Sequence, residues 1–107
     1  MAERREAYFR HAAYYAEALL NAEQLYIQGS DQDLQGLKKF DQDWVNIQIA
    51  QRWTASSYEI DDQAARLCCE FPERGANCLF LRQKPEQRIE WLNSALQAAQ
   101  KLGYVIS

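Results

Sequence analysis

The stretch HAAYYAEALLNAEQLYIQGSDQDLQGLKKFDQDWVNIQIA, residues 11–50, decides the fold. Apolar groups recur at spacings of four and three on both sides of its central glycine, which is the period of an amphipathic helix. Gly29 permits the left-handed backbone conformation that often follows a helix, and Ser30 offers a side-chain oxygen to cap the next one. Because so short a connection separates two long helices, the sequence predicts an antiparallel helical hairpin.

Each helix of this hairpin has a predicted inner face. The first helix, expected over residues 3–28, presents a stripe of six residues: Tyr8, Ala12, Tyr15, Leu19, Ala22 and Tyr26. The second presents Leu34, Leu37, Phe40, Trp44, Ile47 and Ala50, with Trp53 just beyond. Its neighbours Lys38, Lys39, Asp41 and Gln42 are expected to point mostly outward.

A second hairpin is predicted for the rest of the chain. Ser, Thr and Asp in the segment TASSYEID, residues 54–61, favour a loop at about residues 57–60, and Asp61 or Asp62 can cap the third helix. Pro72 predicts a kink or split near Glu70 in one bent helix over residues 62–82, since proline removes a hydrogen bond and clashes with the preceding turn. The expected inner face of this helix is Ala64, Leu67, Cys68, Phe71, Gly75, Cys78 and Leu79.

The fourth helix is expected to begin at Pro85 and to stop at Gly103. Its predicted inner face is Ile89, Leu92, Leu96 and Ala99. The sequence therefore predicts an all-α fold of four to five helices in antiparallel hairpins, forming one domain over residues 1–107. We expect this domain to be a fragment of a larger multidomain protein.

Composition excludes several classes of function. The 12 Lys and Arg against 15 Asp and Glu give a net charge of −3, which repels a nucleic-acid backbone. No apolar run approaches the ~20 residues that span a bilayer, and the N-terminus lacks the apolar segment of a signal peptide, so we expect no membrane partner and a cytoplasmic location. Three cysteines, read as reduced thiols, agree with that compartment.

The residues that carry chemistry form no recognisable constellation. Cys68, Cys69, Cys78 and the single His11 lack zinc-ligand spacing, and the cysteines are interpreted as small packing groups on the third helix. The glycines are too far apart for a phosphate-binding loop, and no nucleophile, base and orienting acid can be assembled around His11. We therefore expect no enzyme activity, cofactor or metal. An enzyme or redox sensor using Cys69 or Cys78 is a third-ranked hypothesis.

Two patterns resemble known helical repeats. WLNSAL, residues 91–96, resembles the WLxxAL stretch in the second helix of tetratricopeptide-type repeats. HAAYYAEALLNAE from His11, GSDQ from Gly29, FDQDWVNIQIAQRW from Phe40 and WLNSAL together resemble the helical segment that follows the NB-ARC and winged-helix modules in bacterial STAND regulators, just before or within their tetratricopeptide array. The resemblance implies a tetratricopeptide-like right-handed stack. It also implies a sensor or scaffold section that binds a protein or effector, or holds the ATPase inactive, in a signalling regulator.

The leading functional hypothesis is a non-catalytic protein-interaction or scaffold module, whose partner is another protein or a neighbouring domain of the same chain. The alternative is a structural homodimerisation or spacer domain, motivated by the heptad-like stripe from Tyr8 to Tyr26. Self-association is expected if the chain is cut from a longer protein. The candidate interface residues are Phe9, Tyr14, Tyr104, Val105 and Ile106.

Overall fold

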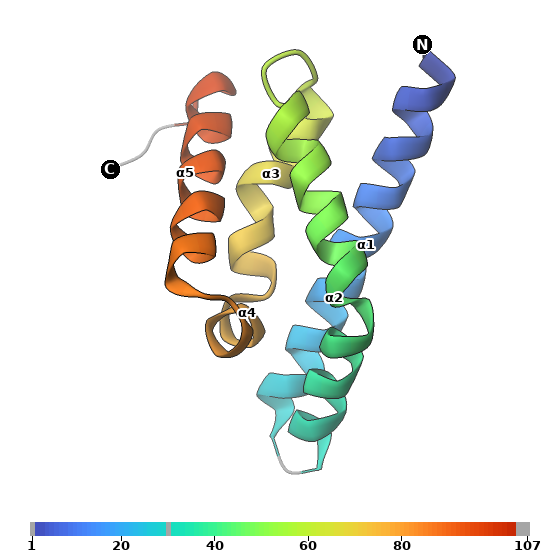
Figure 1. The fold of residues 1–107 in the computed structure, drawn as a ribbon, viewed down its shortest axis with the longest axis vertical. Coiled ribbons are helices and arrows are strands. Elements are labelled where there is room, and N and C mark those ends of the chain that lie inside the picture. Colours follow the sequence, from blue (N-terminus) through green and yellow to red (C-terminus); the bar gives the residue numbers. More distant parts are fainter. Residues whose placement is uncertain (1, 30, 105–107) are drawn as a thin grey trace.

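A computed structural model describes residues 2–29 and 31–104, and these residues form five helices and no strand. The helices are α1 (Ala2–Gln28), α2 (Gln32–Ser57), α3 (Asp62–Arg74), α4 (Ala76–Arg82) and α5 (Pro85–Lys101). Figure 1 shows α1 and α2 as one long hairpin, with α3 beside it and α5 on the far side of α3. The predicted all-α fold and the first hairpin are confirmed.

The first hairpin closes where the sequence places the turn. Gly29 has φ +77°, the left-handed conformation expected after α1. The predicted cap, Ser30, lies outside the described residues, while Asp31 precedes α2 and its side chain makes no capping hydrogen bond. Gly36 permits the closest approach of the two helices, because a Cβ there would lie 2.5 Å from the Tyr26 backbone nitrogen and 2.6 Å from the Ala22 carbonyl oxygen.

Ten of the twelve predicted inner-face residues of α1 and α2 are buried or half-buried, and two are exposed. Ala12, Leu19, Ala22, Phe40, Ile47 and Ala50 are fully buried. Tyr8 is 49% exposed and Leu34 is 72% exposed, so their predicted burial is wrong. Leu34 lies near the closed end of the hairpin, which extends beyond α4 in Figure 1, and Tyr8 lies near the other end, where one side of its ring stacks on Trp53 at 6.4 Å.

The second hairpin begins with the predicted cap. Asp61 Oδ1 accepts hydrogen bonds from the backbone nitrogens of Gln63 at 3.0 Å and Ala64 at 3.2 Å. The loop that precedes it follows Ser57, as expected. The predicted inner face of this segment is also confirmed: all of its residues are buried except Leu67, which is half-buried.

The break in this segment falls at Gly75, not near Glu70 as predicted. Pro72 stands in the last turn of α3, and the helix ends two residues later, at Arg74. Gly75 instead meets α1, because a Cβ there would lie 2.3 Å from Leu19 Cδ1. The single bent helix of the prediction is therefore two helices, α3 and α4.

A buried carboxylate on α1 holds the start of α4. Glu23 is 7% exposed, and its Oε2 accepts hydrogen bonds from the Asn77 backbone nitrogen at 3.0 Å and from Asn77 Nδ2 at 2.8 Å. Its Oε1 accepts from the Cys78 backbone nitrogen at 3.0 Å. These bonds satisfy amide groups in the first turn of α4 that have no partner within the helix. Glu23 thus ties the second hairpin to the first.

The predicted inner face of α5 is wrong. Ile89, Leu92 and Leu96 are 58%, 51% and 42% exposed, and Ala99 is half-buried. The buried stripe is Trp91, Ala95 and Ala98. Trp91 packs between Trp44 and Phe71, at 5.9 Å from each ring, and Ala98 packs with Ala65 and Cys68 of α3. Small residues let α5 approach α3 closely, which leaves the larger aliphatic side chains outside.

Gly36→Ala should lower the free energy of unfolding by about 1–3 kcal/mol, because the new methyl group meets backbone atoms that cannot move aside. Alanine favours a helix over glycine by about 1 kcal/mol, so the loss must come from the helix contact. Urea unfolding followed by circular dichroism measures it. Gln35→Ala, at an exposed position next to Gly36, should change stability by about 0.5 kcal/mol or less. Equal stability of Gly36→Ala and wild type would contradict the close approach.

Glu23→Gln should destabilise the protein by about 2 kcal/mol or more, because a charged acceptor of several hydrogen bonds is lost and an amide N–H is placed among donors. The same unfolding experiment measures this change. Glu17→Gln is the matched control, since Glu17 is an exposed carboxylate on the same helix whose contact to Arg74 is at 3.5 Å. That control should lose about 1 kcal/mol at most.

Candidate interaction surface

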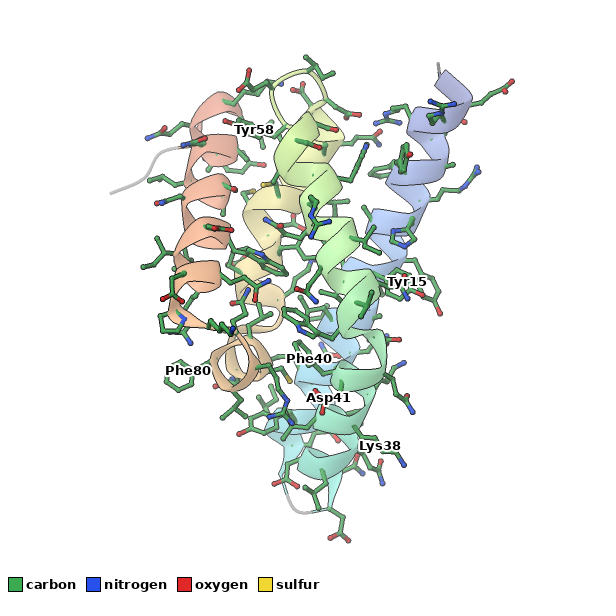
Figure 2. The ribbon with its side chains drawn as sticks, viewed as in Figure 1. Tyr15, Lys38, Phe40, Asp41, Tyr58 and Phe80 are labelled. Carbon is green, nitrogen blue, oxygen red and sulfur yellow. The ribbon has the colours of Figure 1, made fainter. Side chains whose placement is uncertain are left out.

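The main candidate surface lies on α4 and α5 and consists of Phe80, Ile89, Leu92 and Leu96, hereafter the outer face. Phe80 is 67% exposed, and Figure 2 shows its ring projecting from α4 away from the other helices. Three of the residues recur at spacings of three and four along α5, so they form one stripe. Burial of Trp91, Ala95 and Ala98 against the core is what turns this stripe outward.

A small pocket of about 150 Å³ opens beside the outer face, between α3, α4 and α5. Phe80 and Leu92 belong to its lining, so the pocket and the outer face are continuous. The rest of the lining is apolar except for Gln83 and Arg88. A cavity of about this volume is large enough for one benzene-sized group.

The two polar side chains of the pocket have nitrogen atoms without partners. Gln83 Nε2 and Arg88 Nε are buried and find no hydrogen-bond acceptor among residues 2–29 and 31–104. The Arg88 guanidinium lies 4.8 Å from the centre of the Phe80 ring, and Arg88 Nη2 donates to the Phe80 carbonyl oxygen at 3.2 Å. Arg88 is therefore held in place at one edge of the pocket.

A neighbouring arginine, Arg82, forms an ion pair within the chain. Arg82 Nε and Nη2 donate to the two carboxylate oxygens of Asp41 on α2, at 2.8 and 3.1 Å. These hydrogen bonds raise the pKa of Arg82. The pair links the end of α4 to the first hairpin, so it supports the position of the outer face.

A second groove, of about 650 Å³, lies between the start of α1 and the turn from α2 to α3. Tyr8 and Trp53 form part of its wall, and Ile60 at its edge is 90% exposed. Across this groove Arg5 Nε and Nη2 donate to Asp61 at 2.6 and 2.9 Å. The hydrogen bond from Arg5 is the main reason that the pKa of Asp61 is lowered.

The predicted interface residues do not form one site. Phe9 is half-buried, with its ring edge-on to Trp53 at 6.5 Å and 5.1 Å from the Arg5 guanidinium. Tyr14 is 66% exposed and Tyr104 is 50% exposed. The first two lie on α1 and Tyr104 follows α5, and these helices lie on opposite sides of the molecule in Figure 1. Val105 and Ile106 lie outside the described residues.

The sequence-based interface omitted Phe80, Gln83, Arg88 and the exposed stripe of α5. The spacing of the α5 stripe is evident in the sequence, but it predicts a core position for these residues. A second stripe, Trp91, Ala95 and Ala98, has the same kind of spacing. Its composition distinguishes it, because one aromatic and two small residues suit close packing against α3. Gln83 and Arg88 have no such signal, because their significance depends on what surrounds them.

The cysteine thiols are buried or half-buried, and His11 packs on an aromatic ring. Cys68 and Cys78 are fully buried, and burial raises the pKa of Cys68 to about 11 and that of Cys78 to about 12. Burial also raises the pKa of the half-buried Cys69. The reactive form of cysteine, the thiolate, is therefore scarce at neutral pH. His11 packs on the Tyr15 ring at 4.8 Å, and the described part of the chain has no group of three or more His, Cys, Asp or Glu arranged to hold a metal.

Comparisons of the chain with models of protein families, with curated proteins and with solved structures gave no significant match. None of the helices within residues 2–29 and 31–104 has both the length and the apolar character needed to span a membrane. The outer face, its pocket and the residues around them are therefore the features that bear on the function of the chain.

At pH 8 one thiol per chain, Cys69, should react with a chromogenic disulfide reagent within minutes, because the other two are buried and protonated. All three should react once the protein is unfolded in guanidinium chloride. Cys69→Ser should remove the fast phase, whereas Cys68→Ala should leave it unchanged. Rapid reaction of a second thiol in the native protein would contradict the burial of Cys68 and Cys78.

Proposed function

We propose that the chain is a non-catalytic protein-interaction or scaffold module whose outer face binds a protein partner or a neighbouring domain of the same chain. The observation that carries the proposal is the exposure of Phe80, Ile89 and Leu92, at 67%, 58% and 51%. Single exposed apolar residues are common on protein surfaces, but a continuous patch is a frequent mark of an interaction site.

The arrangement of the helices supports the same function. The first hairpin packs against α3, and α5 packs on the other side of α3. The last helix of such a stack has a packed side and an open side, and each unit of a helical stack needs a neighbour to cover its apolar surface. In this chain the open side of α5 is the outer face, so a covering partner would remove its apolar groups from water.

The resemblance to tetratricopeptide-type repeats extends this proposal. A right-handed stack of this type, continued beyond α5, would place the next hairpin on the outer face. In a bacterial STAND-type signalling regulator of the cytoplasm, with an NB-ARC ATPase elsewhere in the protein, this surface would hold the array together or contact an effector. The support for this extension is the WLNSAL pattern in α5 and the hairpin architecture.

Homodimerisation is the second candidate, and the outer face is also the feature that favours it. The heptad-like stripe from Tyr8 to Tyr26 no longer does, because Ala12, Leu19 and Ala22 in that stripe are fully buried within the chain. A dimer of this protein would therefore pair two outer faces. Sedimentation equilibrium distinguishes it, since the average mass would rise with concentration and Leu92→Glu would abolish the rise.

Replacement of Leu92 by the photoreactive residue benzoylphenylalanine should give a discrete covalent adduct with a protein partner on irradiation in cells. The same replacement at Gln42, an exposed position on α2, should give none. Adding Ile89→Glu should remove the adduct, because a charge in the outer face opposes its burial. An absence of adducts at position 92, with the variant folded, would overturn the proposed function.

A further inference from the structure

We propose that the partner of the outer face is an amphipathic helix carrying an aspartate or glutamate, and that this acidic side chain enters the pocket beside Gln83 and Arg88. This inference rests on the proposed function and names the chemistry of the partner. Apolar residues on the same side of the partner helix cover Ile89, Leu92 and Leu96. The acidic side chain supplies the acceptor that Gln83 Nε2 and Arg88 Nε lack among the described residues.

The pocket favours a ligand with a hydrogen-bond acceptor, because the two side-chain atoms that lack a partner among the described residues, Gln83 Nε2 and Arg88 Nε, are both donors. Gln83 is only 7% exposed, and its Nε2 has no acceptor within the described part of the chain. The same is true of Arg88 Nε. A buried N–H without an acceptor destabilises whichever state contains it, so a ligand oxygen that accepts from either group gains more than one placed in water.

A carboxylate fits these donors better than a neutral carbonyl group does. Arg88 carries a positive charge and forms no ion pair within residues 2–29 and 31–104, in contrast to Arg82, which is paired with Asp41. No acidic residue belongs to the pocket lining. A carboxylate has two oxygen atoms that can accept from several N–H groups, and its hydrogen bonds to a guanidinium are stronger than neutral ones.

The shape of the site points to a helix with one side chain inserted. The pocket volume of about 150 Å³ suits a single side chain. A glutamate would place its methylene groups against the apolar wall formed by Leu79, Pro72 and Trp91, and its carboxylate at the donors. Alongside, the three aliphatic residues of α5 form a straight ridge, into which the ridges of a second helix can pack.

The test uses the full chain and a displayed library of 18-residue helical peptides. Each peptide has leucines fixed at positions i, i+3 and i+7, and the residues next to them vary among Glu, Asp, Gln, Lys and Ala. Selection on the immobilised protein should enrich Glu or Asp at one position. In a synthetic peptide of the selected sequence, Glu→Gln (or Asp→Asn, where aspartate is selected) should then weaken binding about tenfold, which is the effect of one lost charged hydrogen bond.

Variants of the protein identify the pocket as the origin of this preference. Arg88→Met keeps an apolar stem and should weaken binding of the acidic peptide about tenfold. The neutral peptide should bind Arg88→Met as it binds wild type, because the two changes remove the same interaction. Arg66→Met, the same substitution at an exposed position of α3, should have no effect. If Arg88→Met melts early, Arg88→Lys should still lose affinity, because lysine lacks the planar fork of N–H groups.

The outcomes separate this inference from the proposed function. Peptides that bind the outer face, lose binding with Leu92→Glu and carry no acidic preference would overturn the acidic partner and leave the interaction module intact. Equal effects of Glu→Gln on wild type and on Arg88→Met would also overturn it. Stable dimers that exclude every peptide would assign the face to a second copy and overturn the acidic helix. Absence of peptide binding together with absence of adducts at position 92 would overturn both.

Discussion

The interaction on which the rest of the structure depends is the contact of α1 with the break between α3 and α4. Leu19 and Glu23 stand one turn apart on α1, one against Gly75 and the other bonded to the first amides of α4. A helix of seven residues has little stability of its own, so its direction must come from such contacts. Because Phe80, Gln83 and the turn into α5 follow from that direction, a buried carboxylate on the first helix positions a surface formed by the last two.

The second determinant is the way in which α5 meets α3. Trp91 fills the space between Trp44 and Phe71, while Ala95 and Ala98 allow the helix axes to come close. Once the aromatic ring and the small residues are placed inside, the geometry of the helix leaves Ile89, Leu92 and Leu96 outside. The apolar surface is thus a direct result of efficient core packing, and it gives the pocket beside Gln83 its open, apolar border.

Much of the fold could be predicted because it follows from local features. The period of apolar residues, the glycine at position 29 and the cap at Asp61 act within one or two turns, and they fixed the hairpins and the inner face of α3 and α4 correctly. The break at Gly75 could not be predicted, since it depends on Leu19 and Glu23, which are more than 50 residues away in sequence. The face of α5 could not be assigned from spacing either, because two stripes on that helix have the same period. The candidate site follows from these two features, so the sequence indicated scattered aromatic and aliphatic residues in its place.

The close approach at Gly36 also explains the form of the first hairpin. Near the closed end, the backbones of α1 and α2 are separated by little more than hydrogen atoms, whereas near the other end the rings of Tyr8, Phe9 and Trp53 stand between them. The three aromatic rings hold the two helices apart at the open end, whereas Gly36 lets them meet near the closed end. The width of the groove beside Arg5 and Asp61 therefore follows from three aromatic rings at one end of the hairpin and from a missing side chain near the other.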